Sequence, residues 1–357
     1  EGSDDPINSW TQTTLADTGN LSFATFGGGQ FLVGGAGGTL TRRDAGGTAW
    51  ARVGDSGTRQ RLFGGAIAGD TRLAVGWLGT VTVSKNDGAW RLVKGVELVN
   101  IEDVIHDGDR FLAVGKAGKV GLSADGETWA FHNGGTTDWL KHITTGDGAY
   151  AAVGMRGTIV TSTNGTKWTE RNTPTSSGLE SVAFGNGRFV AVGFMGTILY
   201  SDNGQRWIAA KSGTKEWLND VTFGGGMFVA VGANGTLLTS FDGKAWMRRS
   251  SGTETSLGGV AFGDRRFIIA GRAGLILESG QLAASPEPPT LTATLAKGGK
   301  PRLVIDGQEG QLYRIEVSAD LRQWKVLKLI EGAAKPVEFV DESGTTERDS
   351  FYRTVTP

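Results

Sequence analysis

The 357-residue chain contains no cysteine, which excludes disulfide bonds and thiolate-bound metals. It has only three histidines, and no calcium-binding loop, P-loop or catalytic-triad motif. No apolar run approaches the roughly 20 residues of a membrane-spanning helix. The 36 basic and 37 acidic side chains nearly cancel, which gives no electrostatic case for binding nucleic acid or an anionic membrane. The sequence therefore predicts no cofactor, no metal, no membrane span and no nucleic-acid partner.

Glycine, in contrast, is abundant, with 58 residues, and many of them follow a period of 39 to 41 residues. One glycine ends an apolar segment of the Ala-Val-Gly type and recurs at Gly35, Gly76, Gly115, Gly154, Gly193, Gly232 and Gly271. A tryptophan after a turn of the Asp-Gly type recurs with nearly the same period at Trp10, Trp50, Trp90, Trp129, Trp168, Trp207 and Trp246. Two independent anchors with one period indicate a repeat array.

Each repeat alternates short apolar segments with Gly-rich turns. In the sixth unit, strands are expected at Leu218–Phe223, Met227–Gly232, Thr236–Ser240 and Ala245–Arg249, because β-branched and aromatic runs bounded by Gly, Asn and Asp are typical of strands and hairpins. Four strands in about 40 residues is the size of one propeller blade. The repeat predicts an all-β fold, a closed seven-bladed β-propeller, in which the periodic Trp residues pack between neighbouring blades.

The two anchors are out of phase at the chain ends. A Trp expected near position 285 is missing, whereas Trp10 precedes the first repeat glycine. We therefore expect the strand around Ile7–Thr13 to be the outer strand of the last blade. It would pair with the unit at Leu257–Ser279 and close the ring, which removes exposed strand edges. The alternative is an open stack of hairpins.

The repeat ends before the C-terminal region. Residues 1–283 are assigned to the propeller and residues 284–290 to a linker, because the three prolines of Ala283–Thr290 stiffen the chain. In residues 291–357, strands are expected at Thr292–Leu295, Arg302–Ile305, Tyr313–Val317, Trp324–Leu329, Val337–Val340 and Phe351–Val355. Six strands in about 70 residues predict a small β-sandwich, immunoglobulin-like or fibronectin-like in style.

Three of the turns carry a family resemblance. SADGETW (Ser123–Trp129), STNGTKW (Ser162–Trp168) and SFDGKAW (Ser240–Trp246) resemble the Asp boxes, or BNR repeats, of sialidase-type propellers and the repeats of photosystem II assembly-factor propellers. The resemblance extends over nearly all of residues 7–280, although the family box usually has one more residue between Ser and Trp. Since the Asp box is a folding turn far from the active site, the resemblance implies the fold and not an activity.

A shorter resemblance concerns the C-terminal region. YRIEVSADLRQWKVL (Tyr313–Leu327) and SFYRTV (Ser350–Val355) resemble a module common on secreted and surface proteins of Verrucomicrobia-like bacteria. That resemblance implies export. The lack of cysteine fits this origin, and a start at Glu1 without Met is consistent with a removed signal peptide or a trimmed chain. We expect a bacterial protein that is secreted, periplasmic or held at the cell surface.

The candidate binding residues are large side chains that the repeat does not require. In a propeller, the connection into each first strand and the turn between the second and third strands lie on one face. The side chains expected there are Trp77, Trp139, Met155, Arg156, Phe194, Met195 and Trp217. All except Trp77, which lies over blade two, should form one patch over blades four to six. An apolar patch rimmed by polar groups is typical of an interaction site, and aromatic rings also suit sugar stacking. The alternative is that these side chains plug the channel.

Enzyme signatures are weaker. A sialidase-like site needs a channel Tyr beside an acid and three Arg, but Tyr150 replaces the repeat Phe and Tyr200 ends a third strand. The face arginines form no assignable triad; they are Arg59, Arg61, Arg156 and Arg272. A glycosidase needs two carboxylates at a set separation, and the loop candidates are Glu97, Asp138, Glu180, Glu216 and Glu254. His106 and His142 fall on adjacent first strands without accompanying carboxylate spacing, which is typical of structural histidines.

These observations predict an exported, non-catalytic propeller that serves as a binding or assembly scaffold for a protein or glycan partner. The resemblance to photosystem II assembly factors favours a role in assembly. Two alternatives stay open. One is a divergent sialidase-like glycoside hydrolase. The other is a structural component of a cell-surface layer or fibre that self-associates through its C-terminal module.

Overall fold

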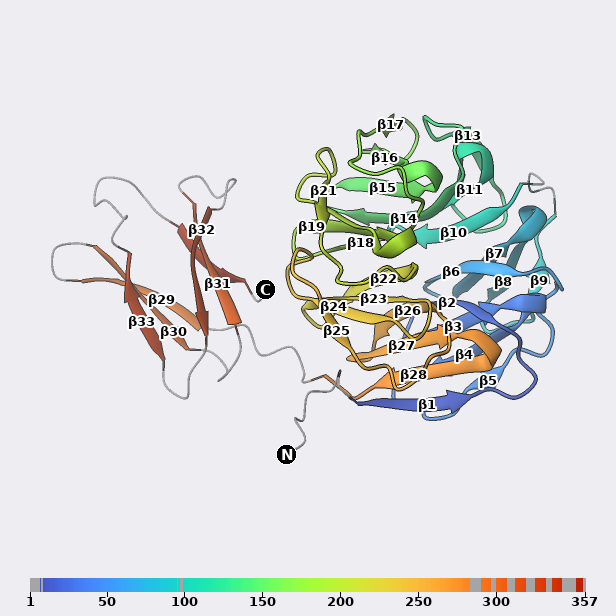
Figure 1. Ribbon diagram of the computed structural model, residues 1–357, viewed down its shortest axis with the longest axis horizontal. Coiled ribbons are helices and arrows are strands. Elements are labelled where there is room, and N and C mark those ends of the chain that lie inside the picture. Colours follow the sequence, from blue (N-terminus) through green and yellow to red (C-terminus); the bar gives the residue numbers. More distant parts are fainter. Residues whose placement is uncertain are drawn as a thin grey trace. The chain divides into compact units, whose positions relative to one another are not determined.

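A computed structural model of the chain describes residues 7, 9–94, 96, 99–282, 290–296, 300–306, 312–318, 325–331, 336–341 and 351–355. The chain divides into two compact units, Glu1–Leu282 and Ala283–Pro357. Regular structure in both units is almost entirely β (Figure 1). Over the ranges just given, no helix is long and apolar enough to cross a membrane.

The described part of the first unit contains seven four-stranded antiparallel sheets, which we number 1 to 7 by the order of their first strands. These first strands are β2 (Leu21–Gly27), β6 (Leu62–Ala68), β10 (Ile101–His106), β14 (Leu140–Gly146), β18 (Leu179–Gly185), β22 (Leu218–Gly224) and β26 (Leu257–Gly263). The second strands are β3 (Gln30–Gly35), β7 (Thr71–Gly76), β11 (Phe111–Gly115), β15 (Ala149–Gly154), β19 (Arg188–Gly193), β23 (Met227–Gly232) and β27 (Arg266–Gly271).

The third strands are β4 (Leu40–Asp44), β8 (Val81–Lys85), β12 (Lys119–Ser123), β16 (Ile159–Ser162), β20 (Ile198–Ser201), β24 (Leu237–Ser240) and β28 (Leu275–Ser279). The outermost strands are β5 (Ala51–Arg52), β9 (Arg91–Leu92), β13 (Ala130–Asn133), β17 (Thr169–Glu170), β21 (Ile208–Ala210), β25 (Met247–Arg249) and β1 (Trp10–Thr14). In sheet 6, the observed strand ends lie within two residues of those expected from the repeat. The repeat pattern therefore located the strands well, because each one is bounded by turn-forming residues.

Short 3-10 helices join second and third strands in six of the seven sheets. They are η1 (Ala36–Gly38), η2 (Trp77–Gly79), η3 (Lys116–Gly118), η4 (Met155–Gly157), η5 (Phe194–Gly196) and η6 (Arg272–Gly274). The middle residue of each has a left-handed backbone conformation, with φ of 60° at Arg156 and 54° at Met195. This conformation costs a non-glycine residue roughly 1 kcal/mol.

The N-terminal strand completes sheet 7. β1 pairs antiparallel with β28, from Trp10 opposite Ser279 to Thr14 opposite Leu275, as the phase of the two anchors predicted. The first strand of each sheet lies beside the first strand of the next, and β26 lies beside β2. The sheets thus follow one another around the unit and return to the start (Figure 1), an order that an open stack of hairpins does not have.

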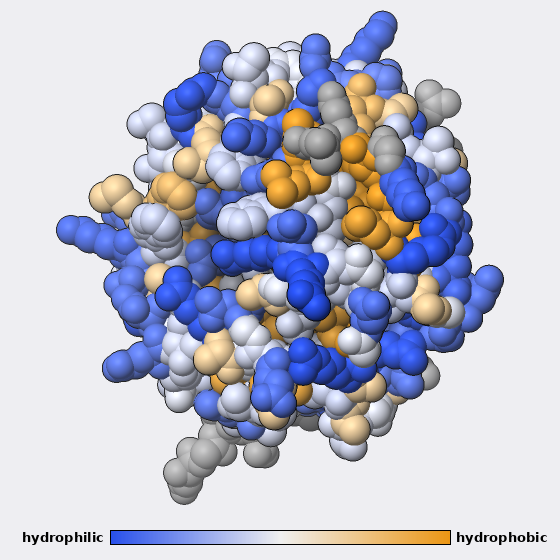
Figure 2. Space-filling model, turned by 90° about the vertical axis from the view of Figure 1, so that its right-hand side faces the viewer, coloured by the Kyte–Doolittle hydropathy of each residue, from blue (hydrophilic) through white to orange (hydrophobic). Residues whose placement is uncertain are grey.

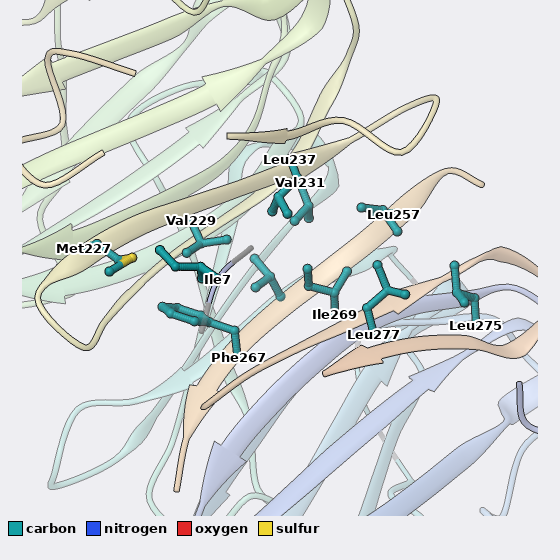
Figure 3. Packing of buried hydrophobic residues seen from close by; sticks show 11 residues of the cluster. Ile7, Met227, Val229, Val231, Leu237, Leu257, Phe267, Ile269, Leu275 and Leu277 are labelled. Carbon is teal, nitrogen blue, oxygen red and sulfur yellow. The ribbon is translucent and has the colours of Figure 1, made fainter. Parts of the chain in front are cut away.

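Apolar clusters fill the spaces between neighbouring sheets. Between sheets 6 and 7, Val229 and Val231 face Phe267 and Ile269, and Ile7 joins them from the N-terminal segment (Figure 3). Each of the seven repeat tryptophans packs against one such cluster. The prediction that these tryptophans have a structural role between sheets is therefore confirmed. The side of the molecule in Figure 2 is mostly hydrophilic, with hydrophobic residues in separate patches.

The turns that resemble Asp boxes share one hydrogen-bond pattern. In sheet 3, Asp125 Oδ1 accepts hydrogen bonds from the backbone N–H of Glu127 and of Thr128, both at 2.8 Å. Trp129 Nε1 donates to the carbonyl of Gly126, which has a left-handed φ of 76°. Sheets 4, 5 and 6 repeat these bonds with Asn164, Asn203 and Asp242 in place of Asp125. The polar residue at this position therefore organises the turn.

The described part of the second unit contains two three-stranded antiparallel sheets. One consists of β29 (Thr290–Leu295), β30 (Pro301–Asp306) and β33 (Val337–Val340), and the other of β31 (Leu312–Ser318), β32 (Lys325–Glu331) and β34 (Phe351–Val355). Leu303 and Ile305 of the first sheet are buried with Tyr313 and Ile315 of the second, so the two sheets share one core. Residues 284–289 of the expected linker lie outside the described residues, and β29 begins at Thr290.

Candidate functional site

One face of the first unit is formed by the turns between second and third strands, and we call it the turn face. Each turn is joined to the residue that precedes a first strand. The backbone N–H of Met155 donates to the carbonyl of Trp139 at 2.9 Å, and that of Ala233 to the carbonyl of Trp217 at 2.8 Å. Equivalent bonds join Trp77 to Arg61 and Phe194 to Gly178. Residues from these two parts of the repeat therefore lie side by side, as expected.

A partly exposed aromatic pair lies on this face over sheets 5 and 6. The rings of Phe194 and Trp217 are stacked, with centroids 4.3 Å apart and planes 14° from parallel. Trp217 is 52% exposed and Met195, next to Phe194, is 67% exposed. Gly178 lies beneath, where an added Cβ would be 3.2 Å from the Phe194 ring and 3.3 Å from Met155 Sδ. We call Met155, Phe194, Met195 and Trp217 the aromatic patch.

The other three predicted site residues lie in different surroundings. Trp139 is half-buried, and Lys141 Nζ lies 4.8 Å from its ring centroid, so a cation covers part of the ring. Arg156 pairs with Asp138 and leaves most of its side chain in solvent. Trp77 packs edge-on against Phe63 of sheet 2, with centroids 6.2 Å apart, and is 47% exposed. Trp77 thus offers a second exposed indole that belongs to a different sheet from the patch.

A cavity of about 710 Å³ lies among the first strands of all seven sheets. Trp217 belongs to the aromatic patch and also lines this cavity. Arg61 and Arg272 reach the cavity from the turn face as well. Each first strand has a β-bulge at the same register, where the pairing with the second strand shifts by one residue. Bulges re-aim side chains and are common next to functional sites.

The bulge involves two consecutive residues of each first strand, and all of them except Ser181 and Gly259 line the cavity. Going from sheet 1 to sheet 7, these pairs are Ser22–Phe23, Phe63–Gly64, Glu102–Asp103, Lys141–His142, Glu180–Ser181, Asn219–Asp220 and Gly258–Gly259. In sheets 3 to 6 both residues of each pair are charged or polar. In sheets 7, 1 and 2 the pairs consist of glycine and phenylalanine, with Ser22 as the one polar residue. The cavity therefore has a polar half and a mainly apolar half.

The second residue of each polar pair bonds to the next sheet, and we call Asp103, His142, Ser181 and Asp220 the inner layer. Their side chains accept hydrogen bonds from the backbone N–H groups of Ile143 (3.1 Å), Val182 (3.4 Å), Val221 (3.2 Å) and Val260 (2.7 Å), in that order. Ser181 Oγ also donates to Asp220 at 2.6 Å. These bonds satisfy backbone donors that the bulge removes from the strand ladder.

His142 lies between two carboxylates of the inner layer. Its Nε2 is 3.4 Å from Asp103 Oδ2 and 3.8 Å from Asp220 Oδ1. Burial raises the pKa of both aspartates, and the neighbouring imidazole of His142 opposes that shift. The expectation that His142 has no accompanying carboxylate was wrong, because its partners come from repeats one and two units away in the chain.

Three of the four first residues of the polar pairs are charged, and we call Glu102, Lys141 and Glu180 the outer layer. Lys141 Nζ is 2.6 Å from Glu102 Oε2 and 3.7 Å from Glu180 Oε2. The Glu102 side chain is 3% exposed, and its Oε1 is buried without a hydrogen-bond partner. Burial raises the pKa of Glu180, Lys141 lowers it, and the charge of Glu102 raises it further. The ammonium group of Lys141 is therefore shared between the carboxylates of Glu102 and Glu180.

The loop carboxylates considered for glycosidase chemistry do not gather at the cavity. Glu180 lines it, but Asp138 bonds to Arg156 and Thr158, and Glu216 accepts from Asn234 at 2.9 Å. Glu254 is exposed, and Glu97 lies outside the described residues. Neither Tyr150, which donates to Asp107 at 2.7 Å, nor Tyr200 lines the cavity. In the part of the chain that is described, no group of three or more potential metal ligands occurs.

Comparison with known proteins identifies the fold of the first unit. No family model and no curated protein sequence match the chain. Among solved structures, YCF48 bound to D1 peptide is similar, with a TM-score of 0.64 and 18% identity over 76% of this chain and 94% of that one. The first unit is a β-propeller.

Two further structures have the same fold. The WD40 β-propeller domain of Doa1 matches with a TM-score of 0.63 and 11% identity, covering 77% of this chain and 96% of that one. A catalytically inactive virginiamycin B lyase from Staphylococcus aureus, determined with quinupristin, matches with a TM-score of 0.67 and 13% identity, covering 76% and 99%. At these identities the likeness concerns the propeller fold alone.

Proposed function

We propose that this protein is an exported, non-catalytic scaffold that binds a polypeptide segment on the turn face of its propeller. In this proposal sheets 1 to 7 are the blades of a closed seven-bladed propeller. The second unit is a small immunoglobulin- or fibronectin-like sandwich that serves for attachment or assembly. The protein would act outside the cytoplasm of a bacterium, secreted or at the cell surface.

The aromatic patch is the observation that carries the proposal. Its side chains are large and apolar, and Met195 and Trp217 are exposed, at positions where the repeat requires nothing of the kind, since sheet 1 has Ala36 and Gly37 in the equivalent turn. Trp, Phe and Met are enriched in protein interfaces, where they bury much area at low entropic cost.

Polar groups surround the patch. Arg156 with Asp138 lies on the side of sheet 4, and Glu216 with Asn234 lies on the side of sheet 6. An apolar centre with a polar rim is the usual anatomy of a protein-binding surface. Support also comes from YCF48, a propeller whose structure contains a bound D1 peptide. A glycan is the second candidate ligand, because the exposed Trp217 ring can stack on a sugar.

A selection experiment tests the proposal. A random peptide display library is selected on the full-length chain, and the same chain is applied to a glycan array. The variant is Trp217→Ala, and the matched control is Trp77→Ala, which removes an indole of similar exposure on the same face but outside the patch. We expect selected peptides that bind the variant about tenfold or more weakly than the wild type and bind the control unchanged.

Two outcomes contradict the peptide proposal. If the selected peptides bind the Trp217→Ala variant as well as the wild type, the patch is not their site. If the only ligand that depends on Trp217 is a glycan, the protein is a lectin-like module instead.

A further inference from the structure

The polar half of the cavity has a charge arrangement that the fold does not need. The inner layer has a structural role, because its four side chains accept hydrogen bonds from backbone N–H groups of sheets 4 to 7. The outer layer makes no such bonds. Its residues Glu102, Lys141 and Glu180 are charged side chains set around a cavity, where burying charge is costly. A ligand of complementary charge would make this arrangement favourable.

Glu102 has an unused acceptor. Its Oε2 bonds to Lys141, but its Oε1 is buried and has no partner, although the side chain lines the cavity. A buried carboxyl oxygen without a hydrogen-bond donor loses its hydration and gains nothing in return. A ligand that brings an N–H donor to this oxygen would remove that cost.

Negative charge is also in excess around this oxygen. Four carboxylates line the polar half, those of Glu102, Asp103, Glu180 and Asp220, against the ammonium group of Lys141 and the imidazole of His142, whereas the two arginines that line the cavity, Arg61 and Arg272, come from sheets 2 and 7. Lys141 is already shared between Glu102 and Glu180. Burial and neighbouring carboxylates raise the pKa values of Glu180 and Asp103, which is the response of acids that lack enough positive charge nearby. A cation would supply it, whereas an anion would be repelled.

We propose that the polar half of the cavity binds an ammonium or guanidinium group, presented by a Lys or Arg side chain of the polypeptide that lies on the aromatic patch. Glu102 and Glu180 are the carboxylate partners of this group. The inference rests on the proposed function and specifies its ligand as a segment with a basic residue beside an apolar one.

The position of Trp217 connects the two sites. Its ring is stacked on Phe194 in the patch, and the same residue lines the cavity. A Lys or Arg side chain that leaves a segment on the patch can lay its aliphatic stem along Trp217 and extend its charged end toward Glu180 and Glu102. The cavity, about 710 Å³, is within the range of roughly 300–1,000 Å³ that is usual for ligand sites.

Small ligands test this site without knowledge of the natural partner. N-acetyl-L-arginine amide and N-acetyl-L-lysine amide are titrated into the full-length chain by calorimetry or ligand-observed NMR. The control ligand is N-acetyl-L-citrulline amide, which keeps the shape of arginine without its charge. We expect the charged ligands to bind about tenfold or more tightly than citrulline. Absence of binding by both charged ligands, or equal binding of the citrulline derivative, would overturn the proposal.

Three variants locate the site. Glu102→Gln and Glu180→Gln remove a carboxylate charge with little change of shape, and each is expected to weaken arginine-amide binding about five- to tenfold. Glu127→Gln is the control, because Glu127 also pairs with two cations, Lys85 and Arg91 at 2.6 Å each, but lies in an outer turn. If Glu102→Gln fails to fold, Glu180→Gln decides the matter, since its ion pair is the longer one. Wild-type affinity in the folded variants would refute the assignment.

The two proposals fail in different ways. Peptides that depend on Trp217, together with no binding of the arginine and lysine amides, would refute the cation site and leave the patch intact. Arginine-amide binding that depends on Glu102 or Glu180, with no peptide dependent on Trp217, would refute the proposed function and leave a cation site in the cavity.

Discussion

The outer turns and the inner bulges of the propeller recur with the same period. The turns repeat their side-chain hydrogen bonds, whereas the bulges repeat only their backbone geometry. In sheets 3 to 6 the outer turns keep one set of hydrogen bonds, centred on Asp125, Asn164, Asn203 and Asp242. The inner bulges keep their backbone register while their side chains change from sheet to sheet, from Gly258–Gly259 to Glu102–Asp103.

This difference separates what the fold requires from what a ligand would require. An outer turn lies far from the axis and does not share a site with the other turns, so the same hydrogen-bond pattern can recur in sheets 3 to 6. The bulges lie around one shared cavity, and residues from different sheets meet there. Variation at a repeated position therefore points to the cavity and the turn face as the places where this propeller differs from a purely structural ring.

The largest effect is expected from Trp207→Ala. Trp207 is 5% exposed, packs near Phe189 and donates to Gly204, so its removal should lower the free energy of unfolding by about 3–5 kcal/mol. Urea-induced unfolding measures the loss. Trp217→Ala, outside the repeat positions and half exposed, should cost less than about 1 kcal/mol. Equal costs for the two variants would erase the distinction between repeat and non-repeat tryptophans.

A second effect concerns the glycines of the inner bulges. A Cβ on Gly259 would lie 2.6 Å from Phe23 Cα and 2.8 Å from the Ala24 nitrogen, both backbone atoms of the next sheet. Gly259→Ala should therefore destabilise the propeller by about 1–3 kcal/mol. Gly54→Ala, where no atom lies within 4 Å, is the control and should be neutral within about 0.5 kcal/mol. If thermal unfolding gives the same stability for the Gly259→Ala and Gly54→Ala variants, sheet 7 has room for a side chain at Gly259.

The outer turns of sheets 4 and 5 have Asn at the position of Asp125, so an Asp125→Asn substitution can be compared with them directly. Two backbone N–H bonds lower the pKa of Asp125 from 3.8 to about 2, so its contribution to stability is present above 3.8 and is lost as the pH falls toward 2. Asp125→Asn copies Asn164 of sheet 4 and should match the wild type at neutral pH. Below 3.8 it should lose less stability than the wild type.

Unfolding curves across this pH range test the turn. A variant that is already unstable at pH 7 would mean that the amide does not replace the carboxylate there. Asp125→Ala provides the reference for loss of both bonds, at a cost of about 1 kcal/mol.

The smallest effect is expected at Glu180. Because burial raises its pKa above 4.5, the folded state holds the proton more tightly, and the stability from this group is lost as the pH rises through the raised pKa. Glu180→Gln should therefore gain stability relative to the wild type above pH 4.5, by less than about 1 kcal/mol. A relative loss at neutral pH would mean that the pair with Lys141 outweighs the burial of charge.

Much of the propeller could be predicted from the period alone. Strand positions, the role of the seven tryptophans and the pairing of β1 with β28 all depend on local patterns and on counting, since turn glycines and apolar alternation act over a few residues. The predicted surface was only partly assembled by the fold. Phe194 and Trp217 do stack, but part of the Trp139 ring is covered by Lys141.

The sequence by itself determined the repeat, its strands and the turns that carry them, because these follow from interactions between near neighbours in the chain. Only the tertiary structure decided that Asp103, His142 and Asp220 meet, and that Lys141 lies between Glu102 and Glu180. These residues come from different repeats and are 39 or more positions apart, except within a pair. When the ring closes, the residues at one periodic position become neighbours around the cavity. Their combination cannot be predicted from local patterns, because each residue comes from a different repeat.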